Sequence, residues 1–231
     1  MLTNNSAQKI VSTMGEWAKV AGELQGEDLK QKIYDNTLLG ICGDLEGKMV
    51  LDYGAGPGII AKKMADKGAD VHVFDISEDM LRIACKVLGQ DKIHRDVREF
   101  TRGQFDFVTC NLVMCIVPES EVAAIAQNIK NALGPAGRAF IGFCNPKIYD
   151  IPESVIDFRF QTGVGYSDNH EYKKKKKEGN YEIVELHRPI EWYLQVFAEA
   201  GMMITQIHFT PEYETDGRAI SDFVIFEMVR A

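Results

Sequence analysis

The sequence lacks any long apolar segment. Its 231 residues contain no uncharged apolar run that approaches the roughly 18 residues a helix needs to cross a lipid bilayer. The segment from Met1 to Lys9 is polar and has no apolar stretch of the kind found in secretory signal peptides. These absences predict a protein with neither signal peptide nor membrane anchor, and we expect it in the cytoplasm.

Basic residues are fewer than acidic residues. The chain has 26 lysines and arginines against 34 aspartates and glutamates, which gives a net charge of −8 at pH 7. An acidic surface repels the phosphates of nucleic acids and the headgroups of anionic lipids. We therefore expect a small-molecule substrate, no nucleic-acid partner and no membrane partner. We further expect a monomer or a homodimer.

Cysteine is sparse and has no recognisable pattern. The five cysteines are an odd number, and none of them forms the CxxC pairs that are typical of zinc sites. The five are Cys42, Cys85, Cys110, Cys115 and Cys144, and most of them lie in apolar segments. The sequence therefore predicts reduced thiols in the core of a cytosolic protein, and no metal site.

What the chain does contain is a regular alternation of two patterns. Short apolar runs typical of strands cover residues 49–53, 69–74, 105–110 and 137–143, the last one after a predicted turn at 134–137. Segments with helical spacing of apolar residues follow at 59–67, 77–88 and 119–133. Such alternation predicts a parallel sheet with helices on both faces, within one domain that spans residues 1–231.

The two ends of the chain complete this prediction. Helical spacing at 6–21 and 27–42 predicts a helical lid over residues 1–47, ahead of a core at 48–144. The region 145–188 is irregular and is interpreted as a cap insertion, in which Lys173 to Lys177 form a solvated turn. Residues 189–231 predict a helix and an antiparallel hairpin. The expected fold is α/β and doubly wound, with seven mostly parallel strands, the last one antiparallel.

The strongest motif is the glycine-rich segment VLDYGAGPG at residues 50–58, where the first parallel strand turns into a helix. Glycines are required there because the backbone turns sharply and lies against a ligand. Asp75 ends the next strand, at a separation suited to accepting hydrogen bonds from ribose hydroxyls.

The spacing of the glycines departs from the dinucleotide pattern GxGxxG, whose third glycine would fall at Ile59. Asp52 precedes the loop, and a carboxylate there repels a pyrophosphate but can receive a cationic amino group, directly or through water. The residues themselves therefore favour S-adenosylmethionine over NAD as the cofactor.

The segments LDYGAGPG at 51–58 and FDISEDML at 74–81 resemble motif I and the segment after the second strand of class I, Rossmann-like S-adenosylmethionine-dependent methyltransferases. This resemblance implies that Gly54, Ala55 and Gly56 line the methionine part of the cofactor, and that Asp75 binds the ribose. It further implies cofactor contacts from Ile76 and Met80 beside the adenine, Asp96 and Val97 at its amino group, and Asn111 and Leu112 near the sulfonium.

The N-terminal region is similar to the lid of small-molecule members of this class, in which an aromatic residue closes over the cofactor. Trp17 and Tyr34 are the aromatic candidates. In the cap, Tyr166 and other aromatic residues either line a substrate pocket or pack the cap onto the sheet, and the sequence leaves both interpretations open.

Methyl transfer to a hydroxyl or an amine releases a proton, and histidine is a suitable base near neutral pH. His187 is the candidate base because it precedes the late helix that borders the substrate side in similar enzymes. His170 and Tyr166 are the candidate substrate contacts. A sulfonium methyl is already activated, so the site has to align donor and acceptor in a dry cavity and needs no metal.

Two alternatives to methyl transfer stay open. An enzyme with the same cofactor motifs could cyclise S-adenosylmethionine or transfer its aminocarboxypropyl arm. A non-catalytic cofactor-binding subunit could use the same fold as an interaction module.

Overall fold

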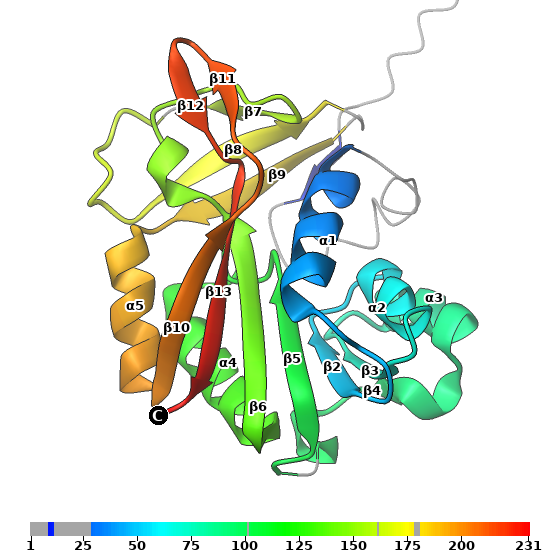
Figure 1. The fold of residues 1–231 in the computed structure, drawn as a ribbon. Coiled ribbons are helices and arrows are strands. Elements are labelled where there is room, and N and C mark those ends of the chain that lie inside the picture. The colour runs from blue at the N-terminus through cyan, green and yellow to red at the C-terminus, as the bar shows by residue number, and fades with distance from the viewer. Residues whose placement is uncertain (1–8, 12–28, 101, 161, 178–180) are drawn as a thin grey trace, which may run out of the picture.

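A computed structural model describes residues 9–11, 29–100, 102–160, 162–177 and 181–231 (Figure 1). Its main element is a seven-stranded sheet with the strand order β10-β13-β6-β5-β2-β3-β4. Strands β2 to β6 pair in parallel, whereas β13 runs antiparallel to both of its neighbours. The expected fold class is therefore confirmed. The strands are β2 (Met49–Tyr53), β3 (Asp70–Phe74), β4 (Ile93–His94), β5 (Phe105–Asn111), β6 (Leu133–Cys144), β10 (Met202–Phe209) and β13 (Phe223–Arg230).

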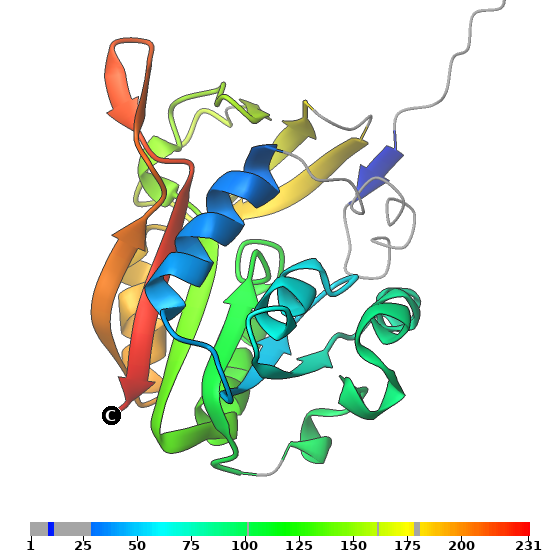
Figure 2. The same ribbon diagram turned by 45° about the vertical axis from the view of Figure 1, so that its right-hand side comes forward.

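Helices cover both faces of this sheet, because successive strand residues point to opposite sides and both sides are apolar. Val50 packs in the core beneath one set of helices, and Leu51 packs in the other core. The first set is α1 (Leu29–Cys42), α2 (Ile59–Ala65) and α3 (Glu78–Leu88); the second is α4 (Glu119–Ala132) and α5 (Ile190–Glu199). Figure 2 shows α1 on the face opposite to α4 and α5.

Local signals fix several of these boundaries where the sequence predicts them. The Ser77 hydroxyl accepts a hydrogen bond from the Met80 amide at the start of α3. By contrast, segment 134–137 is not a separate turn but a register irregularity inside β6, where Leu133 pairs with Phe105 and Arg138 pairs with Phe107. The pairing with β5 continues the strand through residues whose composition is typical of a turn.

A second sheet lies beyond the carboxyl ends of β5 and β6, with the strand order β1-β9-β8-β7 (Figures 1 and 2). Its strands are β1 (Lys9–Val11), β7 (Asp157–Phe160), β8 (His170–Lys176) and β9 (Tyr181–His187). The helix predicted at 6–21 is wrong for residues 9–11, because these residues form a parallel ladder with β9. The rest of that segment lies outside the described residues.

The region 145–188 is consequently more regular than the sequence predicts, since it contributes three of these four strands. We call β7, β8 and β9 the cap sheet. Short 3-10 turns at Gln90–Lys92, Val97–Glu99 and Pro146–Ile148 and a small hairpin of β11 (Tyr213–Thr215) and β12 (Arg218–Ile220) complete the described elements. No helix among the described ranges is long and apolar enough to cross a lipid bilayer.

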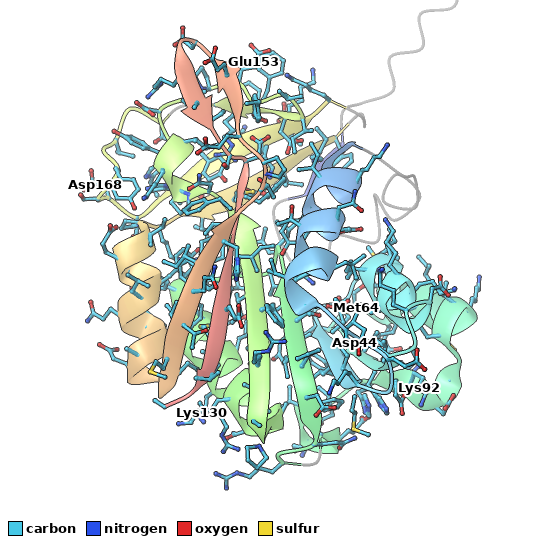
Figure 3. All side chains as sticks on the ribbon, viewed as in Figure 1. Asp44, Met64, Lys92, Lys130, Glu153 and Asp168 are labelled. Carbon is cyan, nitrogen blue, oxygen red and sulfur yellow. The ribbon has the colours of Figure 1, made fainter. Side chains whose placement is uncertain are left out.

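The lysine run is the clearest error of the sequence prediction, since Lys173 to Lys176 belong to β8 and not to a solvated turn. Its side chains alternate, so that Lys174 and Lys176 are buried while Lys175 is exposed. Lys174 Nζ lies 2.5 Å from a carboxylate oxygen of Glu185, and Lys176 Nζ lies 2.6 Å from one of Asp157. Figure 3 shows the side chains that project from the cap sheet and from the parallel sheet.

Replacing Lys174 by methionine is expected to lower the free energy of unfolding by about 3–5 kcal/mol, because the buried carboxylate of Glu185 loses its ammonium partner and Asp157 keeps only Lys176. The matched control Lys175→Met removes an exposed lysine from the same strand and should change it by less than about 0.5 kcal/mol. Urea denaturation measures both. Equal effects would contradict a buried role for Lys174.

Candidate active site

One cavity of about 310 Å³ lies where the carboxyl ends of β2, β3 and β5 face the cap sheet. In open parallel sheets, this edge is where ligands bind. The described residues that line the cavity are Tyr34, Asp35, Tyr53, Gly54, Ala55, Gly56, Pro57, Ile59, Ile60, Phe74, Asp75, Ile76, Ser77, Met80, Asn111, Leu112, Val113, Ile116, Glu121, Ile125, Ile183 and Glu185. The cavity therefore brings together the glycine loop and residues from α1, α4 and the cap sheet.

The glycine loop forms one wall of this cavity. Gly54 and Gly56 have φ angles of 75° and 55°, in the left-handed region that favours glycine. A Cβ atom on Gly54 would overlap the side chain of Val113, whereas one on Gly56 would meet no atom within 4 Å. The loop therefore packs tightly on its protein side and leaves open space at Gly56, which is the form a ligand cradle takes.

Asp75 joins the end of β3 to this loop. One carboxylate oxygen accepts a hydrogen bond from the Gly56 amide at 2.8 Å, and the other accepts one from the Ser77 amide at 2.8 Å. Burial raises the pKa of Asp75, and the two amides partly offset this effect. Each oxygen has a second lone pair, so the carboxylate can still accept hydrogen bonds from ligand hydroxyls.

A chain of hydrogen bonds runs from α1 to β2. The Tyr34 hydroxyl donates to Asn111 Oδ1 at 2.7 Å, and Asn111 Nδ2 donates to Asp52 Oδ1 at 3.3 Å. The Thr109 hydroxyl donates to the same Asp52 oxygen at 2.7 Å. Asn111 and Tyr34 line the cavity, while Asp52 lies behind them and is 1% exposed.

The other oxygen of Asp52, Oδ2, is buried and has no hydrogen-bond partner among the described residues. Burial raises the pKa of Asp52 to about 7, and the nearby carboxylates of Asp35 and Asp75 add to this effect, while Thr109 and Asn111 oppose it. A buried, unpartnered carboxyl oxygen beside a ligand cavity fits a cationic or hydrogen-bond-donating group on the ligand.

Sequence reasoning missed several residues of this cavity, among them three from α1 and the cap sheet. Asp35 is buried beside Tyr34 and pairs with Lys63 at 3.1 Å. Ile183 and Glu185 reach the cavity from β9 of the cap sheet. The alternation of inward residues at 181, 183, 185 and 187 is the signal that a strand prediction needs, and the assignment of this region to an irregular cap obscured it.

Besides Asp52, which lies behind the lining, two predicted cofactor contacts do not line this cavity in the described structure. Asp96 forms hydrogen bonds with Arg98 that lower its pKa to about 2, and it is not among the lining residues. Val97 lines a separate hollow. Trp17, the second aromatic candidate for the lid, lies outside the described residues.

The predicted base and substrate contacts gather elsewhere. The rings of His187 and His170 lie 4.6 Å apart, and both line a separate cavity of about 20 Å³, which has room for about one water molecule. His187 Nε2 lies 2.7 Å from the Tyr166 carbonyl oxygen, and burial lowers the pKa of this histidine. The Tyr166 hydroxyl accepts from the Ile190 amide at the start of α5 and donates to Glu191. The structure therefore does not bring these three residues to the glycine loop.

A cluster that could hold a metal does occur among the described residues. Potential ligand atoms of Cys115, Cys144 and Glu185 all lie within 4.8 Å of one another. However, Lys174 Nζ lies 2.9 Å from Cys144 Sγ and 2.5 Å from Glu185 Oε1. A protonated amine therefore already occupies the cation position of this cluster.

Comparison with known proteins places these features in context. The family described as "Methyltransferase domain" matches residues 26–186. The chain is 30% identical over 184 residues to a ubiquinone biosynthesis O-methyltransferase of Acinetobacter baylyi, with 74% of this chain and 71% of that enzyme covered. It is 40% identical over 140 residues to the enzyme of the same name from Aromatoleum aromaticum, but the alignment covers 56% of this chain and only 58% of that relative.

Solved structures of low sequence identity share the fold. An S-adenosylmethionine-dependent methyltransferase of Mesorhizobium loti has a TM-score of 0.62 at 20% identity, with 84% of this chain and 96% of that chain covered. The magnesium protoporphyrin IX methyltransferase of Synechocystis, solved with bound S-adenosylhomocysteine, has a TM-score of 0.57 at 19% identity, with coverage of 93% and 92%.

Gly142 of β6 determines where Tyr34 sits, because a Cβ atom on Gly142 would overlap the Tyr34 hydroxyl. Gly142→Ala is expected to lower the free energy of unfolding by about 1–3 kcal/mol through overpacking. The control Gly40→Ala adds a methyl group to an exposed position of α1 with no atom within 4 Å, and should leave stability unchanged or raise it by up to about 1 kcal/mol. Thermal and urea denaturation distinguish the two, and a neutral Gly142→Ala variant would contradict the packing of Tyr34.

Proposed function

The chain belongs to the methyltransferase domain family, and we propose how its residues hold S-adenosylmethionine and a small-molecule acceptor. It is an S-adenosylmethionine-dependent methyltransferase that acts on a small molecule. These residue roles rest on one observation. The glycine loop, Asp75 and Asn111 line the same cavity at the carboxyl ends of the parallel strands.

In this proposal, Gly54, Ala55 and Gly56 provide the backbone against which the methionine part lies. Asp75 accepts hydrogen bonds from the ribose hydroxyls through the lone pairs that the Gly56 and Ser77 amides leave free. Asp52 receives the amino group directly, through water or through Asn111. The remaining cofactor contacts come from the lining of the cavity and are Tyr34, Ile76, Met80, Asn111 and Leu112.

When bound, S-adenosylmethionine supplies a methyl group that its sulfonium has already activated. The chain's own residues then have to exclude water and align the acceptor. Apolar side chains from several elements, Val113, Ile116, Ile125 and Ile183, line the same cavity and serve the first purpose. Because the matched relatives are methyltransferases, methyl transfer is favoured over the cyclising and aminocarboxypropyl alternatives and over a non-catalytic subunit.

Asp96 and Val97 stay predicted adenine contacts, although neither lines the cavity. The roles of His187, His170 and Tyr166 as base and substrate contacts also stay predictions from the sequence. The expectation that the protein has no nucleic-acid partner, and that it is a monomer or a homodimer, also stays a prediction from the sequence.

Asp75→Ala is expected to weaken binding of S-adenosylmethionine more than tenfold, because the ribose loses its acceptor and the Gly56 and Ser77 amides lose their partner. The control Asp79→Ala removes a partly exposed acid of α3 that pairs with Arg82 and does not line the cavity, and should change affinity less than twofold. Calorimetric titration of the purified proteins measures both, with NAD as a ligand that should not bind. Unchanged affinity in Asp75→Ala would overturn the ribose assignment.

Asp52 predicts a pH dependence of cofactor binding. The pKa of Asp52 in the ligand-free protein lies near 7, above the usual value of 3.8. The folded protein therefore loses stability as pH rises from 3.8 to about 7, because the unfolded chain releases this proton at lower pH than the folded protein does. A cationic amino group on the ligand favours the ionised form, so affinity should rise about tenfold between pH 5.5 and pH 7, with a proton released on binding below pH 7.

Asp52→Asn should bind more weakly at pH 7 and lose this pH dependence, whereas Asp44→Asn, at an exposed position, should retain it. Calorimetry in two buffers of different ionisation enthalpy measures the released proton. An identical pH profile in wild type and Asp52→Asn would refute the role of Asp52.

A further inference from the structure

Glu185 is a buried acid on the cap side of the cavity. It lies on β9, is 2% exposed, and lines the cavity together with the glycine loop. None of the cofactor motifs includes it, and it comes from a strand of the cap sheet rather than from the parallel sheet. Any role of Glu185 toward the methyl acceptor rests on the proposed function, because the acceptor has to meet the cofactor in this same cavity.

Residues of β8 hold both oxygens of the Glu185 carboxylate. Lys174 Nζ lies 2.5 Å from Oε1, and the Tyr172 hydroxyl donates a hydrogen bond to Oε2. The Cys144 thiol lies 3.6 Å from Oε1. Tyr172 is directly opposite Glu185 in the strand register, so the orientation of the carboxylate is set by the pairing of β8 with β9.

These partners decide the charge of Glu185. Burial would raise its pKa, but the ammonium of Lys174 and the hydroxyl of Tyr172 outweigh burial and hold the pKa below the usual value. Glu185 is therefore an ionised carboxylate near neutral pH. An ionised carboxylate has about four lone-pair positions, so Oε2 can accept a further hydrogen bond besides that from Tyr172.

The other charged residues at the cavity have the same sign. The described lining contains four acids, Asp35, Asp75, Glu121 and Glu185, and no lysine or arginine among the described residues. Lys63 and Lys174 partly neutralise Asp35 and Glu185 from outside the lining, but the acids are the charged groups at the cavity itself, so an anionic ligand in this partly desolvated space would face repulsion. A neutral or cationic ligand would not.

The rest of the lining is apolar and partly aromatic. Tyr53 and Phe74 lie with their ring centroids 4.8 Å apart, and isoleucines from α4 and β9 lie at the same cavity. Apolar walls with a few fixed polar groups are typical of small-molecule pockets, and aromatic side chains offer faces on which the ring of a ligand can stack.

We propose that Glu185 binds the methyl acceptor, and that this acceptor is a ring-bearing hydroxyl or amine compound without an anionic group. Its O–H or N–H donates a hydrogen bond to Glu185 Oε2, which orients the heteroatom. In the transfer, that heteroatom forms a bond to the methyl carbon while the carbon–sulfur bond breaks and its electron pair stays on sulfur. The acceptor proton leaves to solvent.

Three catechols that differ only in the charge of their side group test this proposal: 3,4-dihydroxybenzylamine, 4-methylcatechol and 3,4-dihydroxybenzoate. Their binding to the full chain saturated with S-adenosylhomocysteine is measured by calorimetry, and their methylation with S-adenosylmethionine by mass spectrometry. The cationic and neutral compounds should bind at least tenfold more tightly than the benzoate. Glu185→Gln should reduce this preference below threefold while S-adenosylhomocysteine affinity changes less than twofold.

The matched control is Glu171→Gln, which removes an exposed acid on β8 and should retain the wild-type order. Replacing Glu185 also disturbs its ion pair with the buried Lys174, so a second variant is needed. Tyr172→Phe keeps both charged groups and removes one hydrogen bond to Glu185. It should weaken binding of 3,4-dihydroxybenzylamine about threefold. Equal or tighter binding of the benzoate, no binding of any catechol, or an unchanged order in Glu185→Gln would each overturn the proposal. Failure of the wild-type chain to bind S-adenosylmethionine would instead refute the proposed function.

Discussion

The ion pair between Lys174 and Glu185 links the cap sheet to the ligand cavity. Each partner alone would be costly in this buried position, because burial favours the uncharged form of both. Together they allow an ionised carboxylate at the wall of the cavity while the ammonium stays among Glu185, Asp157 and Cys144. The pairing of β8 with β9 fixes this geometry, so the electrostatic character of the cavity depends on a sheet that lies outside the cofactor-binding core.

Helix α1 is connected to the parallel sheet by a different kind of interaction. Tyr34 donates its hydroxyl hydrogen to Asn111, which in turn donates to Asp52 on β2. Neutral hydrogen bonds of this kind contribute modestly to stability, but each one fixes the orientation of the next side chain. Gly142 leaves the space that the Tyr34 hydroxyl needs. The position of α1 over the cavity is therefore coupled to the residues that end β2 and β5.

The sequence predicts the parallel core well because its signals are local. The glycine loop, Asp75 at the end of β3 and Ser77 at the start of α3 each depend on a few neighbouring residues, and the described structure has these elements where they are expected. The lysine run fails for a physical reason. Consecutive lysines show no contrast in hydropathy, so burial of Lys174 depends on acids that are distant in the sequence, Glu185 and Asp157. His187 does not line the cavity, and its neighbours also depend on residues that are distant in the sequence, because the pairing of β8 with β9 sets them.

Asp52 and Glu185 illustrate how neighbours set the charge of buried acids near one cavity. Both are almost fully buried, yet burial raises the pKa of Asp52 to about 7, whereas Lys174 holds that of Glu185 below its usual value. The difference arises because Asp52 has a hydroxyl and an amide as partners, and Glu185 has an ammonium. The charge of Glu185 is therefore present before any ligand enters. The charge of Asp52 becomes more favourable when a ligand brings a cation to it, so the two acids suit the two parts of a reaction between a cationic cofactor and an acceptor without negative charge.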